Sequence, residues 1–424
     1  MKKLLTNGLV WQETGFARLD VLIEHDQIIK IGENLFEPYV DVVDCQGTYI
    51  LPGMVDMHVH VGEKICGLDL ADDFTSLNRL AARCGISALG VFLTEKHSDD
   101  KNQKLLLQQY EQITEKAHKE FEHPIHWHLT PIMSEPEDIA VLLNAGCDLK
   151  FYTTYRANGI YRSYEDISRW MQELKDHKTR MLIHCEDDEI VSAMSAYNPF
   201  QHPFDTTKRR PEIAEIRAVE KVLDLAVAHS YPVHIVHVST PGAAMLIYEA
   251  RQHAPVTCET APQYLFLNDE YLKRIDGHRW LCTPPMRSDK SRGLMVELLQ
   301  DGLFDAIATD HCPYKLADKD LNKDNPEQVP VGLAGLGATL PLTYENLVKP
   351  GKLSIEKLML YISTNPAKLM NLYPKLGTIQ TGSSAQLIML QMKPDNQFCQ
   401  ILPSLMDTHN PWEGMVTNMK IKVL

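Results

Sequence analysis

The sequence lacks the patterns that mark several common protein classes. Its nine cysteines include no C-x-x-C pair, so neither a zinc knuckle nor a disulfide framework is indicated. No run of about 18 or more apolar residues occurs, which leaves no candidate for a membrane-spanning helix. The chain also has no G-x-G-x-x-G motif and no Walker A loop, the two phosphate-binding patterns typical of open nucleotide-binding sheets.

Positive charge is also scarce. The net charge is −14 and the pI is about 5.7, whereas proteins that bind nucleic acid or a membrane surface need a basic face. At the N-terminus the apolar stretch stops at Asn7-Gly8, too early for a signal peptide. These absences predict a soluble cytoplasmic protein whose partners are small molecules, with no nucleic-acid and no membrane partner.

The chain length and the order of its segments predict the main fold. With 424 residues and 44% hydrophobic content, the sequence has room for a barrel of about 250 residues and a smaller accessory domain. Between residues 53 and 373, apolar strand-like runs alternate with helical stretches, which is typical of a parallel sheet covered by helices. Because the nucleotide-binding loops are missing, we expect a (β/α)8 TIM-like barrel rather than a doubly wound sheet.

The two ends of the chain predict a second domain. Strand-like runs occur early, at residues 8–11, 17–24 and 27–32, and late, at residues 385–390 and 419–424. Neither group alone can cover both faces of a sheet. We therefore expect a small discontinuous β-sandwich domain formed by both termini.

The expected boundaries follow from these runs. Residues 1–52 and 374–424 would form the β-sandwich domain, and residues 53–373 the barrel domain. Within the barrel, the polar run at 316–328 is expected to be a long exposed loop.

A pair of histidines follows the first apolar run of the predicted barrel. His58 and His60 alternate on one strand, so both imidazoles point to the same face and are able to hold one metal ion. Later apolar runs end in further groups that bind or serve a metal, namely Lys150, His184, His237 and Asp310. Active sites of (β/α) barrels lie at the C-terminal ends of the strands, so this recurrence predicts a metal centre.

The residue types suit hydrolysis of an amide at two zinc ions. Bound water has a pKa of about 7, and the metals polarise the carbonyl. His58 and His60 would hold one ion, and His184 and His237 the other. Asp310 would bind the first ion and also take the proton from the bridging water.

Lys150 needs a separate explanation. An ammonium group cannot bind a metal, although a lysine carboxylated by CO2 offers two carbamate oxygens. From its spacing alone, Lys150 is an ordinary lysine near the end of a strand.

The ordered motifs together resemble a known family. They are His58-x-His60, Lys150 before an aromatic residue, the runs 183–187, 237–240, 258–265 and 283–287, and Thr309-Asp310-His311-Cys312-Pro313. This set resembles the amidohydrolase superfamily, and within it the cyclic amidohydrolases: dihydroorotase, dihydropyrimidinase or hydantoinase, and allantoinase.

The resemblance carries implications for the site and the assembly. It implies two Zn²⁺ ions bridged by carboxylated Lys150 and a hydroxide, with Asp310 as the catalytic base. It also implies a homodimer or homotetramer.

The predicted substrate is a cyclic amide of the dihydropyrimidine or hydantoin type. Tyr155 lies five residues after Lys150, where hydantoinases place a tyrosine that binds the oxyanion of the opened amide. Thr283 would replace their substrate-contacting serine. His311 would contact substrate or fix Asp310, and the sequence does not separate these roles.

The main alternative is a dihydroorotase, which acts on dihydroorotate and carbamoyl aspartate. Such enzymes carry an arginine two residues beyond the second histidine to bind the substrate carboxylate, and here that position is Gly62. Arg156 would have to replace it. Two further alternatives are a catalytically inactive, assembly-forming relative and a single-metal deaminase with unmodified Lys150.

Two further groups have mainly structural interpretations. His126 and His128 form a second H-x-H pair, but no third ligand follows on that strand, so we expect a structural or surface role. Glu186 is expected either to cap the next helix together with its acidic neighbours or to orient a ligand histidine.

Overall fold

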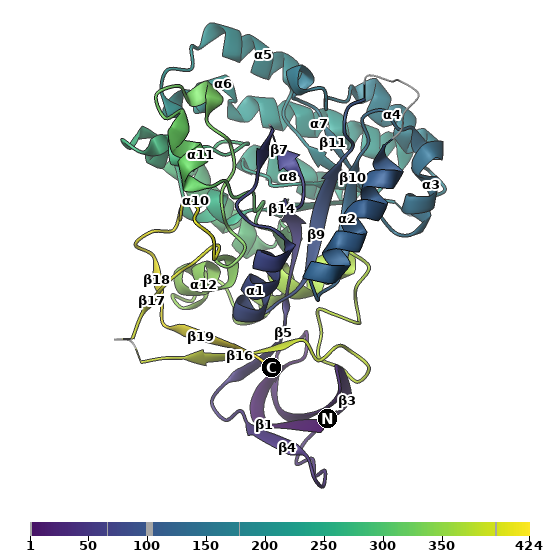
Figure 1. Ribbon diagram of the computed structural model, residues 1–424, viewed down its shortest axis with the longest axis vertical. Helices are drawn as coiled ribbons and strands as arrows, with labels where there is room; N and C mark the ends of the chain where they lie inside the picture. The colour runs from purple at the N-terminus through teal and green to yellow at the C-terminus, as the bar shows by residue number, and fades with distance from the viewer. Residues whose placement is uncertain (1, 66, 99–104, 178, 395–396) are drawn as a thin grey trace.

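The computed structural model describes residues 2–65, 67–98, 105–177, 179–394 and 397–424. A larger body of strands and helices lies above a smaller sheet that carries both chain ends (Figure 1). Among the helices in these ranges, none has both the length and the apolar character that crossing a bilayer requires.

The larger body is built on an eight-stranded parallel sheet in which strand order follows chain order. Its strands are β6 (Met54–Val59), β9 (Ile86–Thr94), β10 (Ile125–Thr130), β11 (Asp148–Tyr152), β12 (Met181–His184), β13 (Val233–Ile235), β14 (Val256–Thr260) and β15 (Ala306–Ile307). An isolated parallel bridge joins Val59 to His311, so the sheet is nearly closed. The predicted TIM-like barrel is confirmed.

Helices alternate with these strands and cover the sheet. The longer ones are α1 (Phe74–Cys84), α2 (Leu106–Glu120), α3 (Pro136–Asn144), α4 (Tyr164–Glu173), α5 (Asp188–Tyr197), α7 (Glu212–His229), α8 (Pro241–Ala250) and α10 (Asp289–Asp301). The shorter ones are α6 (Thr206–Arg209), α9 (Pro262–Phe266), α11 (Leu316–Leu321), α12 (Thr339–Thr343), α13 (Ile355–Met359) and α14 (Asn365–Leu369). Helix α1 shows how the sequence sets their ends: the Asp73 side chain caps the first turn by accepting from the Ser76 amide, and Gly85 stops the helix at a left-handed φ of 77°.

Strands from both ends of the chain form a separate seven-stranded sheet, as predicted. Its members are β1 (Lys2–Trp11), β2 (Phe16–Glu24), β3 (Gln27–Gly32), β4 (Asp41–Asp44), β5 (Tyr49–Pro52), β16 (Leu387–Met392) and β19 (Met419–Val423). The sheet forks at β1, because one edge of that strand pairs with β4 near its start and with β5 near its end. We propose the predicted domain boundaries at residues 52–53, where β5 of the terminal sheet gives way to β6 of the barrel, and at 373–374, between the last barrel helix α14 and strand β16.

The expectation for residues 316–328 was wrong in part. This run contains helix α11 and a 3-10 turn at Pro326–Gln328. Lys319 is buried, and its Nζ donates to the carbonyl of Pro330 at 3.2 Å. The prediction failed because it was based on the polar composition of the segment, whereas the buried side chain of Lys319 anchors the segment to the protein.

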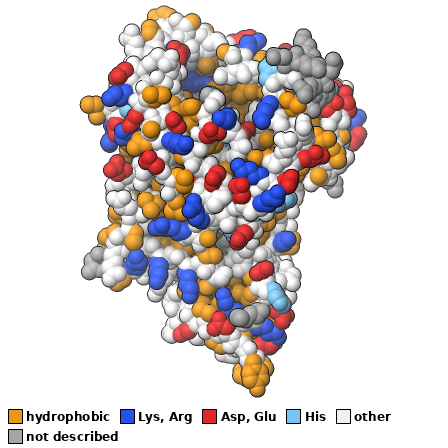
Figure 2. Space-filling model, viewed as in Figure 1, with side chains coloured by type: hydrophobic (Ala, Val, Ile, Leu, Met, Phe, Trp, Pro, Cys, Tyr) orange, Lys and Arg blue, Asp and Glu red, His pale blue; other side chains and the backbone are white. Residues whose placement is uncertain are grey.

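Acidic and basic side chains are interspersed over one face of the molecule (Figure 2).

Candidate metal centre

The six predicted metal ligands come from five strands and gather at one end of the barrel. His58 lies in β6, Lys150 in β11 and His184 at the end of β12. His60, His237 and Asp310 lie one, two and three residues after the ends of β6, β13 and β15. The side chains therefore converge where the C-terminal ends of parallel strands meet, as in other barrel active sites.

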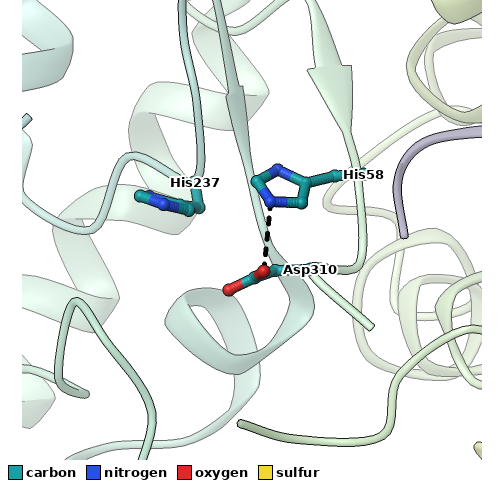
Figure 3. Close-up of side chains that lie close together, drawn as sticks. All are labelled: His58, His237 and Asp310. Atoms are coloured by element: carbon teal, nitrogen blue, oxygen red, sulfur yellow. Dashed lines mark ion pairs between the residues drawn. The ribbon is translucent and has the colours of Figure 1, made fainter. Parts of the chain in front are cut away.

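Three of these side chains reach into the same space (Figure 3). The ligand atoms of His58, His237 and Asp310 all lie within 4.8 Å of one another. Asp310 Oδ1 is 3.1 Å from His58 Nε2 and 3.4 Å from His60 Nε2. Burial raises the pKa of Asp310, but the charges and hydrogen bonds of the two histidines outweigh it and hold the pKa well below its usual range. Asp310 is thus an ionised carboxylate facing two imidazoles, a donor set suited to a divalent cation.

Glu259, in β14, contacts His58 at Nδ1, the ring nitrogen that does not face Asp310. The sequence motif that contains Glu259 did not indicate this contact. Glu259 Oε1 accepts a hydrogen bond from His58 Nδ1, and its Oε2 lies 3.3 Å from His234 Nε2. Both carboxylate oxygens are therefore used within the barrel interior. A carboxylate bound to the far nitrogen of a ligand histidine fixes the tautomer that leaves the near nitrogen free for metal.

The second predicted pair, His184 and His237, also lies together. Their ring centroids are 4.5 Å apart. Burial lowers the pKa of both imidazoles, most strongly that of His237. His184 Nε2 lies 2.8 Å from Glu186 Oε2, while Asp187 caps helix α5. Of the two roles expected for Glu186, the contact with His184 belongs to Glu186 itself, whereas the helix is capped by its neighbour Asp187.

Lys150 is completely enclosed in the barrel. Its side chain is 1% exposed, and among the described residues its Nζ has no hydrogen-bond partner. The amine lies 4.8 Å from the ring centroid of Phe92 and 5.1 Å from that of Tyr152. Burial lowers the pKa of Lys150 to about 8, against the carboxylates of Glu259 and Asp310. A buried, unpaired amine of this kind is costly unless it is modified or bound.

Three predicted site residues have a left-handed backbone. The φ angles are 68° at Tyr155, 40° at His237 and 50° at Asp310. Residues other than glycine adopt this conformation at a cost, and such residues cluster at functional sites. Here each of them lies two or three residues after the end of a barrel strand.

The predicted substrate contacts have different surroundings. Burial raises the pKa of the Tyr155 phenol above its usual range, although the charge of Arg210 and a hydrogen bond with Thr283 oppose this rise. The Tyr155 ring lies 5.2 Å from that of His184. Tyr155 and Thr283 therefore neighbour each other beside the second pair of histidines.

His311 points away from the metal ligands. Its Nε2 lies 3.1 Å from Asp72 Oδ2, and its Nδ1 accepts from the amides of Gly335 and Leu336 at 3.1 and 3.2 Å. The side chain is fully buried. Both ring nitrogens of His311 are thus engaged by Asp72 and the loop at 335–336, and the two roles predicted for His311 stay predictions.

The second H-x-H pair does have a third potential ligand, supplied by the neighbouring strand. Ligand atoms of His126, His128 and Asp148 lie within 4.8 Å of one another. However, the Asp148 carboxylate is already 2.9 Å from His126 Nε2 and 3.6 Å from the Arg180 guanidinium. We interpret the group as a buried ion-pair network, in line with the structural role expected from the sequence.

Comparisons with known proteins agree with this geometry. The family model described as Amidohydrolase family matches residues 49–423. D-phenylhydantoinase of Escherichia coli O7:K1 (strain IAI39 / ExPEC) is 27% identical over 433 residues, which cover 98% of this chain and 91% of that protein. The crystal structure of dihydropyrimidinase from Brevibacillus agri NCHU1002 superposes with a TM-score of 0.90 at 25% identity, over 100% of this chain and 94% of that one. D-hydantoinase from a Bacillus sp. AR9 gives the same TM-score of 0.90, identity of 25% and coverage of 100% and 94%.

Proposed function

This chain belongs to the amidohydrolase family, and we propose that it is a metal-dependent hydrolase that opens a dihydropyrimidine or hydantoin ring at an amide C–N bond. The observation that carries the proposal is the convergence of His58, His237 and Asp310 beside a buried lysine. The similarity to D-phenylhydantoinase and dihydropyrimidinase supports the choice of ring.

The donor set fits two zinc ions. His58, His60 and Asp310 would hold one, and His184 and His237 the other. Lys150 would bridge them as a carbamate, which accounts for a buried amine without a hydrogen-bond partner among the described residues. When bound, the two ions would supply hydroxide at neutral pH and polarise the substrate carbonyl.

The side chains of the site perform the remaining steps. Asp310 accepts the proton of the attacking water and returns it to the ring nitrogen as the C–N bond breaks. Tyr155 donates its phenolic hydrogen bond to the oxygen that gains charge, because a phenol of raised pKa stays protonated at neutral pH. Thr283 positions that phenol and contacts the ring.

Two observations favour uncharged rings over dihydroorotate. Position 62 is a glycine with a φ of +79°, and a Cβ there would lie 2.8 Å from side-chain atoms of Phe74 and Ile113, so the position holds no cation and a longer side chain would displace both neighbours. The proposed replacement, Arg156, is 60% exposed and pairs with Asp188 at 2.9 Å. Neither position provides a buried cation for a substrate carboxylate.

The test is a ring-opening assay on zinc-loaded protein. Hydantoin, dihydrouracil, dihydroorotate and allantoin are compared side by side, with zinc counted per chain. We expect turnover of hydantoin or dihydrouracil and two zinc ions per chain. Asp310→Asn should lower kcat at least about 100-fold, since general-base catalysis contributes on that order.

Other outcomes separate the alternatives. Turnover of dihydroorotate alone would establish the dihydroorotase alternative. Two bound metals with no turnover of any ring would overturn the proposed substrate class. A chain that holds no zinc after zinc-supplemented expression would indicate the inactive relative, and one zinc with an unmodified Lys150 would indicate the deaminase.

A further inference from the structure

Arg210 is a partly buried cation beside the candidate metal centre, and it belongs to neither the predicted ligand set nor the predicted substrate contacts. It follows helix α6, and its side chain is only 13% exposed. The guanidinium contacts two site residues at once: Nη1 lies 3.0 Å from Glu186 Oε2, and the guanidinium carbon lies 4.8 Å from the centroid of the Tyr155 ring.

The first contact leads to a metal ligand. Glu186 Oε2 also lies 2.8 Å from His184 Nε2, so one carboxylate oxygen is shared by Arg210 and His184. Glu186 is fully buried, and its other oxygen has no hydrogen-bond partner among the described residues. Arg210 pairs with this buried carboxylate at 3.0 Å, so losing the guanidinium would leave much of the charge uncompensated and would weaken the contact with the histidine.

The second contact leads to the phenol. Tyr155 sits in a strained left-handed conformation with φ of 68°, at the start of a 3-10 turn whose other residues are largely exposed. Its ring also packs against those of Tyr152 and His184, at centroid distances of 5.9 and 5.2 Å. A guanidinium over an aromatic face supplies both an attractive contact and a flat surface that limits rotation of the ring.

The backbone of Arg210 is fixed by a hydrogen bond from Arg287. Arg287 Nη1 donates to the carbonyl of Arg210 at 2.6 Å, and Arg287 Nε donates to Ser239 Oγ at 3.0 Å. Ser239 lies two residues after His237. The segment that carries Arg210 is thus tied to the loop that carries the other ligand of the second metal.

We propose that Arg210 is a positioning residue that orients His184 through Glu186 and aligns the Tyr155 phenol with the scissile amide. This inference rests on the proposed function. It predicts that one side chain controls both metal retention and turnover.

The experiment compares Arg210→Met and Arg210→Lys with the unchanged protein, using kinetics and the rate of zinc loss to a chelator. The matched control is Arg209→Met, because Arg209 is the adjacent arginine but pairs with Glu327 at 3.0 Å, away from the ligands. We expect Arg210→Met to lower kcat and to speed zinc loss by about 10- to 100-fold each, as for other residues that orient ligands. KM should change much less, and Arg210→Lys should restore part of both losses.

A double-mutant cycle tests the link to the phenol. In a Tyr155→Phe background, Arg210→Met should cost less in kcat than in the unchanged protein, because the aligned hydroxyl is already absent. Equal losses in both backgrounds would overturn the Tyr155 part of the proposal. Chelator kinetics like those of Arg209→Met would overturn the His184 part.

The two readouts keep this inference separate from the proposed function. If the unchanged protein opens none of the four rings, the proposed function fails, while zinc loss still reports on Arg210. If Arg210→Met does not fold, Arg210→Lys and Glu186→Gln provide the same comparison, and zinc loss at the unchanged rate in both would contradict the proposal.

Discussion

Glu259 and His58 are joined by a hydrogen bond between the carboxylate and Nδ1, and this contact leaves His58 Nε2 facing Asp310 at 3.1 Å. The bond decides which imidazole nitrogen keeps its proton. It therefore places a proton on Nδ1 and directs Nε2 toward the space where a metal ion would bind.

Replacing Glu259 with Gln should accordingly weaken zinc binding by about 10- to 100-fold while the chain stays folded. The amide keeps the size of the carboxylate but loses the charge that stabilises the Nδ1–H tautomer. Competition with a chromophoric zinc chelator measures the affinity. Zinc affinity like that of the unchanged protein would mean that His58 is held by packing alone.

The proposed carbamate at Lys150 gives a second expectation. Protein stripped of metal and reloaded with zinc should regain two ions per chain faster with added bicarbonate than in buffer depleted of CO2. Bicarbonate supplies the CO2 that would convert the buried Lys150 amine into an anionic carbamate, and only the carbamate would bind the metal ions. Zinc content over time is the measurement, and a labelled carbamate carbon should be visible by ¹³C NMR.

Lys150→Arg serves as the control for that experiment, since a guanidinium keeps the positive charge and is not carboxylated. It should not regain two zinc ions at any bicarbonate concentration. Reloading at the same rate with and without bicarbonate, in the unchanged protein, would count against the carbamate.

The proximity of the predicted metal ligands could be expected from sequence, because each one lies in or after an apolar strand-like run. That pattern is local, and the barrel rule converts it into proximity in space. His58 and Asp310 illustrate this, since strand-end positions alone indicated that they would face one another. The terminal sheet was predictable for a similar reason: too few strands at either end implied a partner at the other.

The residues that contact the predicted ligands were harder to identify from the sequence. Glu259 stood in a recognised motif but had no role until its contact with His58 was seen. Arg210 carries no local signal, because its partners Glu186 and Tyr155 are set by tertiary packing. Arg156 was named in the dihydroorotase alternative as the cation that would bind the substrate carboxylate, yet its side chain is exposed and pairs with Asp188.

Gly62 provides a prediction about stability. Gly62→Ala adds a Cβ 2.8 Å from Phe74 and Ile113 at a φ of +79°, so both overpacking and backbone strain oppose it. We expect a loss of about 2–4 kcal/mol in the free energy of unfolding. Gly159→Ala is the matched control, because Gly159 has a φ of +78° with nothing within 4 Å.

The control should lose only the strain contribution, about 1–2 kcal/mol. Urea denaturation of both variants measures the difference. Equal losses would show that Phe74 and Ile113 move aside, which would also weaken the argument that this position excludes a longer side chain.

Asp320 in helix α11 gives the pH-dependent prediction. It accepts hydrogen bonds from Arg279 Nε and Nη2 at 2.8 and 2.6 Å and lies 2.8 Å from His278 Nε2. The Arg279 hydrogen bonds, followed by the contact with His278, lower the pKa of Asp320 from 3.8 to about 2. A depressed carboxyl pKa contributes stability that is fully present above the unfolded-state pKa of about 3.9 and is lost as the pH falls through the folded-state value.

Asp320→Asn should therefore reduce the free energy of unfolding by about 1 kcal/mol at pH 7, a figure discounted because the pair is partly exposed to solvent. Below about pH 2 both forms carry an uncharged side chain, so the difference should vanish. Urea midpoints at pH 7, 4 and 3 follow this change, with Asp318→Asn in the same helix as the control for removing a negative charge. A difference that stays constant between pH 7 and pH 3 would show that Asp320 acts through packing, and α11 would then owe its position to buried Lys319 instead.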